Sequence, residues 1–386
     1  MKGTLRNDDM APNNGKKISV AVIIDEFCVG GAEKQLTELL PLFDRNTFDV
    51  SFIVLYQFEG RVTLYDQLPE WLPVYKLNFR NSKDIMSWVE LYKTLRTIKP
   101  DVVMPNLFFS NTSVRMLKPL LGYKVIITEH NTYIDKSRKQ IFIDKALSYL
   151  TYKIVAVSST VATFTAEQER IPKEKFVVIH NGVDVGKIQS KLAELPSKDA
   201  LRKEFGFTAS DKILLNVAGL KSKKRHKIML DGFALFHKKY PEYRLAIAGE
   251  GPLRSKLEVQ ARELGIGDVV TFFGLRRDIE KFYKMSDIFV STSDIEGLSI
   301  AYLEALASGL PVVSTKTSGT DELITNGENG FFIPESSPEA VSETLEKMAN
   351  ANLNQMGDKA RVKVNEFDIH KTAEKYSELI IEACKK

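Results

Sequence analysis

The sequence predicts an α/β fold of two domains, each a parallel sheet that is doubly wound by helices. Two observations carry this prediction: the length of 386 residues, and the alternation of short β-branched apolar runs with longer stretches of helical spacing. One domain takes about 150 residues, so the length suits two domains. Strand and helix patterns that alternate along a chain are typical of parallel sheets between layers of helices.

The first domain is expected over residues 17–184, after a flexible tail at residues 1–16. Its apolar runs predict strands at Ile18–Asp25, Asp49–Tyr56, Val74–Asn78, Asp101–Met104, Tyr123–Glu129, Tyr152–Val157 and Lys175–Ile179. The turn Asn181–Asp184 ends this domain, and we expect it to act as a hinge. Residues 185–212 are rich in Lys, Glu and Ser and predict a linker with an entry helix.

The second domain is expected over residues 213–355. Its apolar runs predict strands at Ile213–Ala218, Arg244–Ala248, Val269–Phe273, Asp287–Thr292, Pro311–Ser314 and Gly330–Ile333. Residues 356–386 predict two helices with an apolar stripe, which we expect to pack back on the first domain. Because open parallel sheets bind ligands at the carboxyl ends of their strands, the loops at those ends are where function should lie.

The composition excludes several classes of protein. With 44% hydrophobic residues, 27% charged residues, 22 Gly and 14 Pro, the chain is neither collagen-like nor largely disordered. The sequence has no apolar run of about 18 residues, and its polar beginning does not resemble a signal peptide, so we expect a cytoplasmic protein. Cys28 and Cys384 lie far apart and match neither a disulfide framework nor a zinc site.

The charge is unevenly distributed. The net charge of +4 is too small to indicate nucleic-acid binding, but residues 71–153 contain 14 Lys or Arg against 6 Asp or Glu. This basic region could meet an anionic surface such as the cytoplasmic face of a membrane, with aromatic contacts from Trp71, Trp88, Phe108 and Phe109. The alternative is a solvated face above an ordinary aromatic core.

The most informative segment is EGLSIAYLEALASGLPVV, residues 296–313. It predicts a turn that leads into a helix, which Gly309 ends and which Pro311 cannot continue. An apolar stripe along this helix is expected at Ile300, Leu303 and Ala307. Glu304 lies at the edge of this stripe, where a carboxylate is costly unless several donors meet it, and the hydroxyls of a ligand could supply them.

The start of the same helix is a candidate anion site. Gly297 leaves the backbone unobstructed, and the free amides of Leu298 and Ser299 favour an anion or a sugar hydroxyl by about 0.3–1 kcal/mol each. The alternative is a helix with a capping interaction and an ordinary exposed Glu304.

Residues 296–313 resemble the glutamate–seven–glutamate signature of retaining glycosyltransferases of family 4, in which two Rossmann-like domains face each other across a cleft in the GT-B fold. Other segments match in the same order: Ala248–Arg254, Val270–Gly274, Ser286–Val290, Gly319 with Glu322, and Asn329–Gly330. The resemblance implies that Glu304 binds the ribose hydroxyls of a nucleotide-sugar donor and that Glu296 holds hydroxyls of the transferred sugar. The amides of residues 297–299 would face the sugar and the diphosphate, with Ser299 standing where glycine is common.

The resemblance extends to a basic segment, residues 219–227. The family has an arginine and a lysine here that hold the diphosphate of the donor. Lys224 matches the lysine, but Gly219 occupies the arginine position, so Lys221, Lys223 or Arg225 would have to replace it. The alternative is a solvated basic turn. Gly274 and Leu275, next to Arg276, match a segment expected near the base of the donor.

In the first domain, Gly30 and Gly31 lie in a Gly-Gly-Ala-Glu segment that the family shows near the donor phosphates. The spacing does not meet the Gly-x-Gly-x-x-Gly dinucleotide fingerprint, which disfavours a hydride-transfer enzyme. His130 matches a family histidine beside the reacting carbon, and Asn131 next to it is a candidate on the acceptor side, as is Asn106. Asn106 stands where relatives often carry histidine, which weakens an assignment to the acceptor.

The resemblance implies a retaining enzyme that moves a sugar from a nucleoside-diphosphate sugar to a hydroxyl of a saccharide or lipid-linked saccharide. Attack would come from the face that the diphosphate leaves. Outside the tail the sequence has no Asp-x-Asp motif, so we expect neither a metal nor another cofactor. Two alternatives are a nucleotide-sugar epimerase of the same fold and a catalytically idle donor-binding or scaffold subunit.

Overall fold

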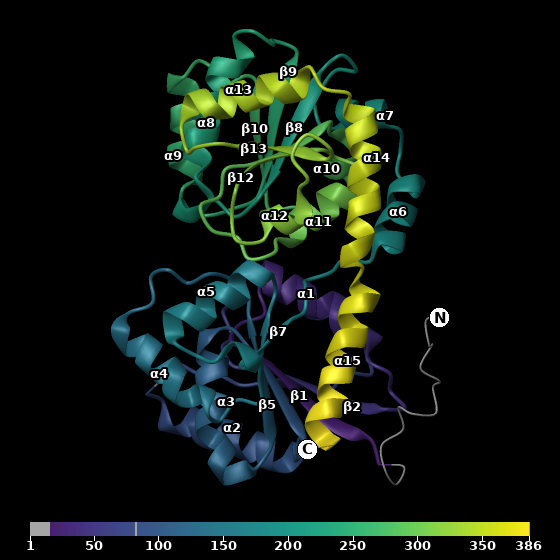
Figure 1. Ribbon diagram of the computed structural model, residues 1–386. Helices are drawn as coiled ribbons and strands as arrows, with labels where there is room; N and C mark the ends of the chain where they lie inside the picture. Colours follow the sequence, from purple (N-terminus) through teal and green to yellow (C-terminus); the bar gives the residue numbers. More distant parts are fainter. Residues whose placement is uncertain (1–15, 82, 386) are drawn as a thin grey trace, which may run out of the picture. The chain divides into compact units, whose positions relative to one another are not determined.

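The computed structural model describes residues 16–81 and 83–385, so almost all of the predicted tail lies outside the described residues. The chain divides into two compact units (Figure 1). Unit 1 comprises the chain up to Gly182 together with the segment from Ile369 onward, and unit 2 comprises Val183–Asp368.

Unit 1 is built on a parallel sheet in the order β3-β2-β1-β4-β5-β6-β7. Its strands are β1 (Ile18–Ile24), β2 (Phe48–Val54), β3 (Val74–Lys76), β4 (Val102–Asn106), β5 (Lys124–Glu129), β6 (Lys153–Ala156) and β7 (Phe176–Val178). Every strand expected in the first half of the chain is present.

Helices cover both faces of this sheet. They are α1 (Gly31–Leu39), α2 (Ile85–Ile98), α3 (Phe108–Leu121), α4 (Arg138–Ser148), α5 (Ser159–Glu169) and α15 (Ile369–Lys385). Side chains alternate along β1, so Val20 and Val22 pack with α1 and α15 while Ala21 and Ile23 pack with α2 and α3. The strands are therefore buried on both faces, which explains their continuous apolar runs.

Unit 2 repeats the architecture with a parallel sheet in the order β10-β9-β8-β11-β12-β13. Its strands are β8 (Lys212–Val217), β9 (Tyr243–Ala248), β10 (Val270–Gly274), β11 (Ile288–Ser291), β12 (Val312–Thr315) and β13 (Gly330–Ile333). Its helices are α6 (Val185–Glu194), α7 (Lys198–Glu204), α8 (His226–His237), α9 (Arg254–Glu263), α10 (Ile279–Met285), α11 (Ile300–Ala307), α12 (Thr320–Leu323), α13 (Pro338–Ala349) and α14 (Leu353–Val364).

The C-terminal segment is divided between the units. Helix α14 packs on α11 within unit 2, and the backbone of Gly357 lies so near the Gly309 carbonyl that a Cβ at Gly357 would be 2.4 Å from that oxygen. Only α15 belongs to unit 1, where it lies beside α1 and buries the expected stripe of Tyr376, Leu379, Ile380 and Ala383. Residues 356–386 are therefore not one body that packs on the first domain.

The expected linker, residues 185–212, belongs to unit 2. It forms α6 and α7, and Arg202 on α7 donates a hydrogen bond of 2.5 Å to Asp287, which lies directly before β11. None of the described helices is both long enough and apolar enough to span a bilayer.

Candidate functional site

Lys224 and Glu296 form an ion pair in unit 2. Lys224 ends a 3-10 turn (Ser222–Lys224) that follows β8, and Glu296 lies in the loop after β11. The two loops are joined by their backbones, because the amide of Asp294 donates to the Lys223 carbonyl over 2.9 Å and the hydroxyl of Thr292 donates to the Lys224 carbonyl over 3.2 Å. The structure thus brings together the two candidate catalytic residues of this unit.

The Lys224–Glu296 pair lies near the surface without being fully exposed. The side chains retain 17% and 11% of their exposure, respectively. Arg225 is more exposed and lies 3.4 Å from Asp294, which sequence reasoning missed as a partner. Lys221 is exposed. A ligand anion therefore has several cations within one basic turn, of which Lys224 is the most fixed.

A buried histidine, His226, directly follows the basic turn and ties it to the sheet. The Nε2 atom of His226 lies 3.0 Å from the Oδ1 atom of Asn216 on β8, and the Asn216 amide donates to the Val290 carbonyl on β11 over 2.8 Å. Burial, and then the charge of Lys224, lowers the pKa of His226 to about 4, so the imidazole is neutral near pH 7. The sequence does not indicate this pair, because His226 lies within the basic segment 219–227 and Asn216 within a strand.

Gly219, which occupies the expected arginine position, has room for a side chain. A Cβ there would meet the Glu250 carbonyl at 3.6 Å, an ordinary contact. The neighbouring glycines differ, because a Cβ at Gly249 would lie 1.9 Å from the Ala218 carbonyl and one at Gly251 would lie 2.6 Å from the Leu220 carbonyl. The missing arginine is therefore not excluded by packing.

In the turn that leads into α11, the backbones of Gly297 and Gly319 lie close together. A Cβ at Gly319 would lie 1.6 Å from the Gly297 carbonyl, so only glycine fits there. Leu298 is buried, and Ser299 is the N-cap residue of α11. Within the described residues the Ser299 hydroxyl caps no backbone amide. The start of α11 is thus a rigid turn beside Glu296.

Glu304 is buried, which contradicts the alternative of an ordinary exposed glutamate. Its Oε2 atom accepts a hydrogen bond of 2.9 Å from the hydroxyl of Tyr283 on α10. Helix α11 is buried on more sides than the expected stripe because α6 and α14 also pack on it, so Tyr302 and Leu306 are buried as well. Tyr283 was missed because it lies on another helix.

Gly274 and Leu275 lie at the carboxyl end of β10. Gly274 has a φ of 69°, in the left-handed region, and its carbonyl accepts from the Gly249 amide over 2.8 Å. Leu275 is 40% exposed, and the Arg276 guanidinium makes two hydrogen bonds, of 2.9 and 2.8 Å, to Asp278. The segment expected near the nucleobase of the donor is therefore a turn with an exposed apolar side chain.

In unit 1, His130 and Asn106 form a buried pair at the carboxyl ends of β5 and β4. The His130 Nε2 atom lies 3.2 Å from the Asn106 Oδ1 atom, and the Asn106 amide donates to the Met104 carbonyl over 3.3 Å. Burial lowers the pKa of His130 to about 4. The imidazole is therefore neutral near pH 7.

Asp25, directly after β1, is a second polar group at this edge of the sheet. It accepts hydrogen bonds from the backbone amides of Phe109, at 3.0 Å, and Ser110, at 2.6 Å, at the start of α3. Leu107 between Asn106 and α3 has φ 76° and ψ 172°, a strained conformation for a residue with a side chain. Such strain is common at functional sites. The sequence indicates Asp25 only as the end of a strand.

Gly30 and Gly31 lie at the start of α1. A Cβ at Gly30 would lie 2.2 Å from a carboxylate oxygen of Glu33, whereas one at Gly31 would meet no described atom within 4 Å. Asn131 is half-buried beside His130 and hydrogen-bonds to Tyr133. The side of α1 at Gly31 is thus open to a ligand.

A buried ionic network lies beneath the loop that carries His130. Asp144 accepts from Arg115 over 2.7 Å and from Lys136 over 3.0 Å, and Lys136 also donates to Glu169 over 2.5 Å. Burial raises the pKa of the nearby Glu129 to about 7, although Lys136 opposes the shift. The network fixes the β5–α4 connection.

Each unit therefore gathers its candidate residues at the carboxyl ends of its own strands. In residues 16–81 and 83–385 there is no cluster of three or more His, Cys, Asp or Glu side chains that could hold a metal ion.

Models of known protein families match both halves of the chain. The model described as glycosyl transferases group 1 matches residues 197–363, and the model described as glycosyltransferase family 4 matches residues 29–187.

Two relatives align along nearly their whole length. An uncharacterized glycosyltransferase of Haemophilus influenzae is 26% identical over 361 residues, which cover 91% of this chain and 96% of that protein. The UDP-Gal:alpha-D-GlcNAc-diphosphoundecaprenol alpha-1,3-galactosyltransferase of Escherichia coli is 25% identical, with coverage of 95% and 97%.

Among solved structures, Anabaena Alr3699/HepE in complex with UDP-glucose matches with a TM-score of 0.82 and 18% identity. The match covers 94% of this chain and 99% of that chain. At this identity the likeness shows the fold alone.

Proposed function

The chain is a family 4-like glycosyltransferase of the GT-B fold, and from this premise we propose that it moves a sugar from a nucleoside-diphosphate sugar to a saccharide hydroxyl with retention of the anomeric configuration. The observation that carries the proposal is the Lys224–Glu296 pair beside the rigid start of α11. The Lys224 ammonium group supports a site for the diphosphate, and the Glu296 carboxylate supports one for the hydroxyls of the sugar.

In the proposed reaction, the bond between the anomeric carbon and the diphosphate oxygen breaks, and a bond to the acceptor oxygen forms on the same face. The acceptor proton passes to the departing phosphate oxygen. Negative charge develops on the diphosphate, and Lys224 and the amides of Leu298 and Ser299 stabilise it. Glu296 accepts hydrogen bonds from the sugar.

A mechanism with a carboxylate nucleophile needs two carboxyl groups about 5 Å apart, one ionised and one protonated. Glu296 instead is paired with Lys224, and Glu304 already accepts a hydrogen bond from Tyr283. Glu304 therefore suits the ribose hydroxyls of the nucleotide, where the buried carboxylate gains further donors. Attack from the face of the leaving group fits this set of residues better.

For unit 1 we propose that His130 and Asn106 orient the acceptor. The neutral His130 can accept or donate one hydrogen bond without placing a full charge near the reacting carbon. Gly31 leaves the start of α1 open to a phosphate. The proposed reaction needs neither a metal nor another cofactor.

We further propose that the acceptor is a lipid-linked saccharide and that the enzyme acts at the cytoplasmic face of a membrane. The support is the basic stretch 71–153 and the name of the Escherichia coli relative, whose acceptor is linked to diphosphoundecaprenol. This stretch carries 14 Lys or Arg against 6 Asp or Glu, so it suits an anionic leaflet.

The test is mass spectrometry of products from a panel of UDP-, GDP- and ADP-sugars with and without lipid-linked acceptors, followed by NMR of the new anomeric centre. We expect one donor class to give an α-linked product, unaffected by EDTA. Conversion of the donor without an acceptor would indicate an epimerase, and donor binding without any product would indicate an idle subunit. Either outcome contradicts the proposal.

A further inference from the structure

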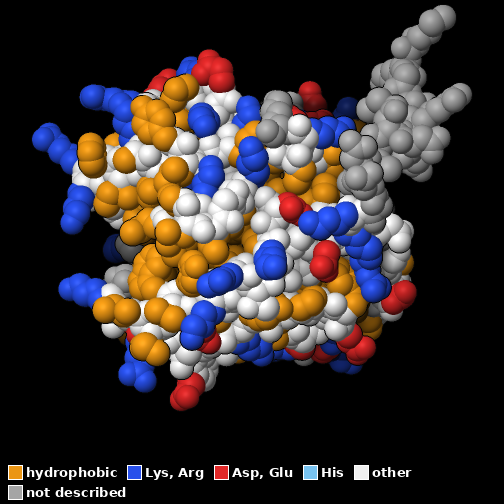
Figure 2. All heavy atoms as spheres, turned by 90° about the horizontal axis from the view of Figure 1, so that it is seen from below, with side chains coloured by type: hydrophobic (Ala, Val, Ile, Leu, Met, Phe, Trp, Pro, Cys, Tyr) orange, Lys and Arg blue, Asp and Glu red, His pale blue; other side chains and the backbone are white. Residues whose placement is uncertain are grey.

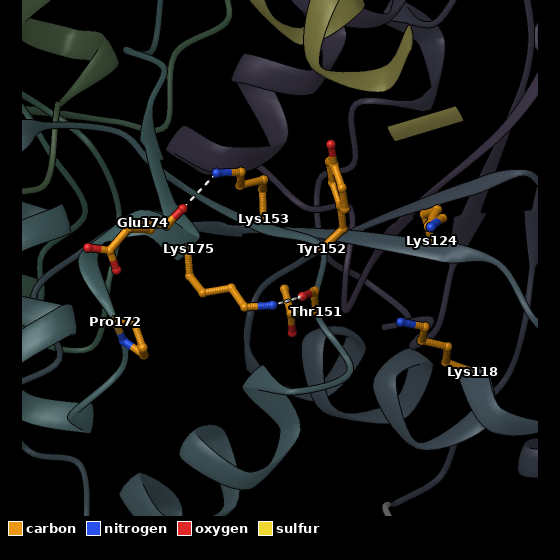
Figure 3. Close-up of a pocket in the computed structure, with 8 residues that line it drawn as sticks. All are labelled: Lys118, Lys124, Thr151, Tyr152, Lys153, Pro172, Glu174 and Lys175. Atoms are coloured by element: carbon orange, nitrogen blue, oxygen red, sulfur yellow. Dashed lines mark hydrogen bonds between the residues drawn. The ribbon is translucent and has the colours of Figure 1, made fainter. Parts of the chain in front are cut away.

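Four lysines surround a cavity of about 440 Å³ in unit 1 (Figure 3). It lies at the amino ends of β5, β6 and β7, whereas His130 and Asn106 lie at the carboxyl ends of their strands. Strand β5 runs from Lys124 to Glu129, so about 17 Å separates the two ends of the sheet. The lining residues are Lys118, Lys124, Thr151, Tyr152, Lys153, Pro172, Glu174 and Lys175.

Three of these lysines are fixed by backbone carbonyls. The ammonium group of Lys118 donates to Leu150 over 2.7 Å, that of Lys175 to Thr151 over 2.7 Å, and that of Lys153 to Glu174 over 2.6 Å. Figure 3 shows the last two of these bonds and the four side chains, which come from different segments. An ammonium group has three donors, so each of the three retains donors for a ligand.

The cavity carries an excess of positive charge, because four of its lining residues are lysines and one, Glu174, is acidic. None of the four ammonium groups is ion-paired to a carboxylate in the part of the chain that the structure describes. Burial and the neighbouring lysines lower the pKa of Lys118, and burial and Lys153 lower the pKa of Lys175. Holding like charges together in this way costs stability, and a bound anion would recover it.

Two exposed apolar side chains lie close in sequence to residues that line the cavity. Leu120 follows Lys118 by two residues and is 70% exposed, and Tyr149 precedes Thr151 by two residues and is 79% exposed. Figure 2 shows hydrophobic side chains gathered beside Lys and Arg on the face that it views. Such a mixture is typical of surfaces that meet the headgroups of a bilayer.

We propose that the lysine cavity binds a phosphate group, supplied by the headgroup of an anionic lipid or by a soluble phosphate ester. The four lysines outnumber the single acidic residue, Glu174, and so leave an excess of positive charge for a phosphate, and the ammonium groups held by carbonyls keep donors for its oxygens. The site is separate from the residues proposed for sugar transfer. Turnover with a soluble acceptor needs none of these lysines, so the cavity and the transfer reaction can fail independently.

The test compares the full chain with the Lys118→Gln/Lys175→Gln variant, in which glutamine removes the charge but keeps a hydrogen-bond donor. One measurement is sedimentation with vesicles of phosphatidylcholine alone or with equal phosphatidylglycerol, and the other is the unfolding midpoint with inorganic phosphate against chloride at equal ionic strength. We expect the variant to bind anionic vesicles about tenfold more weakly or worse. We also expect inorganic phosphate to raise the unfolding midpoint of the variant less than that of the unaltered chain.

Two matched variants make the result specific. Lys256→Gln/Lys347→Gln removes the same charge from exposed positions of unit 2 and should behave as the unaltered chain. Lys118→Arg/Lys175→Arg keeps the charge and should retain binding. If the glutamine variant fails to fold, Lys124→Gln replaces it.

The two probes distinguish the sources of the phosphate. Binding to vesicles without a shift by inorganic phosphate assigns a lipid headgroup, and a shift without vesicle binding assigns a soluble ester. Equal losses in the cavity and control variants, or no loss in either, would overturn the proposal.

Discussion

The ammonium group of Lys224 donates a hydrogen bond to the carboxylate of Glu296, although the two residues are 72 positions apart. Their loops follow β8 and β11, which are neighbours in the sheet. A parallel sheet places the carboxyl ends of neighbouring strands at one edge, so residues far apart in sequence meet there. The candidate site of unit 2 is a direct consequence of this strand order.

Lys224→Gln and Glu296→Gln should each lower kcat by about 10²–10³, because each removes a group that meets the departing diphosphate or its sugar. Steady-state kinetics with the preferred donor measures this. Lys227→Gln is the matched control, since Lys227 lies in the same basic segment but its side chain is 75% exposed. Equal activity of all three variants would remove the site assignment.

The same pair should be coupled in stability. Breaking a partly buried ion pair leaves one charge uncompensated. The losses in the free energy of unfolding of the two single variants should therefore sum to more than the loss in the double variant. Urea unfolding of the two single variants and the double variant measures the coupling. Strictly additive free energies of unfolding would mean that the pair is not formed in solution.

Gly219→Arg should strengthen donor binding by about ten- to a hundredfold, because a charge-assisted hydrogen bond to the diphosphate contributes about 1.5–3 kcal/mol. The position accepts a Cβ at 3.6 Å from its nearest neighbour, so the fold should not be disturbed. Calorimetry with the nucleoside diphosphate gives the dissociation constant.

The contrasting variant is Gly251→Ala, whose Cβ would lie 2.6 Å from the Leu220 carbonyl. It should lose about 1–3 kcal/mol of stability. A stable Gly251→Ala protein, or a Gly219→Arg protein that unfolds, would contradict the geometry of this loop.

Tyr283→Phe should raise the KM for the donor several-fold with little change in kcat, because it removes a donor that orients Glu304 without touching the reacting atoms. Tyr123→Phe is the matched control. Tyr123 is also buried, but its hydroxyl donates to the Val114 carbonyl over 2.7 Å within unit 1. Both variants should lose about 1 kcal/mol of stability. A KM that rises equally in both would show that the effect is structural.

The sequence predicted every strand because parallel strands buried on both faces are continuous apolar runs. It also indicated Glu304, since a carboxylate within an apolar helix is conspicuous. It could not indicate Tyr283, because nothing in the sequence pairs a tyrosine on α10 with a glutamate on α11. Asp25 was missed for the same reason, as its partners begin α3, 84 residues later. The sequence also could not show that α14 packs in unit 2 and α15 in unit 1, because the apolar patterns of both helices are compatible with either arrangement.

Glu129→Gln should change the pH dependence of stability in unit 1. Burial raises the pKa of Glu129 in the folded protein to about 7, above its ordinary value of 4.5, so the folded chain holds a proton that the unfolded chain has released. The stability from this proton is complete below pH 4.5 and is lost as the pH rises through 7.

His130 changes stability with pH in the opposite direction. Its pKa of about 4 in the folded protein lies below the ordinary value of 6.5, so its contribution to stability is complete above pH 6.5 and is lost as the pH falls through 4. The difference between the unaltered chain and Glu129→Gln cancels the histidine contribution. This difference in the free energy of unfolding should fall between about pH 4.5 and 7 and level off above that, by about 1.4 kcal/mol for each pKa unit. Urea unfolding at half-unit steps of pH measures it, with the exposed Glu167→Gln as the control. A flat difference would mean that Glu129 is ionised throughout this range and that Lys136 neutralises it.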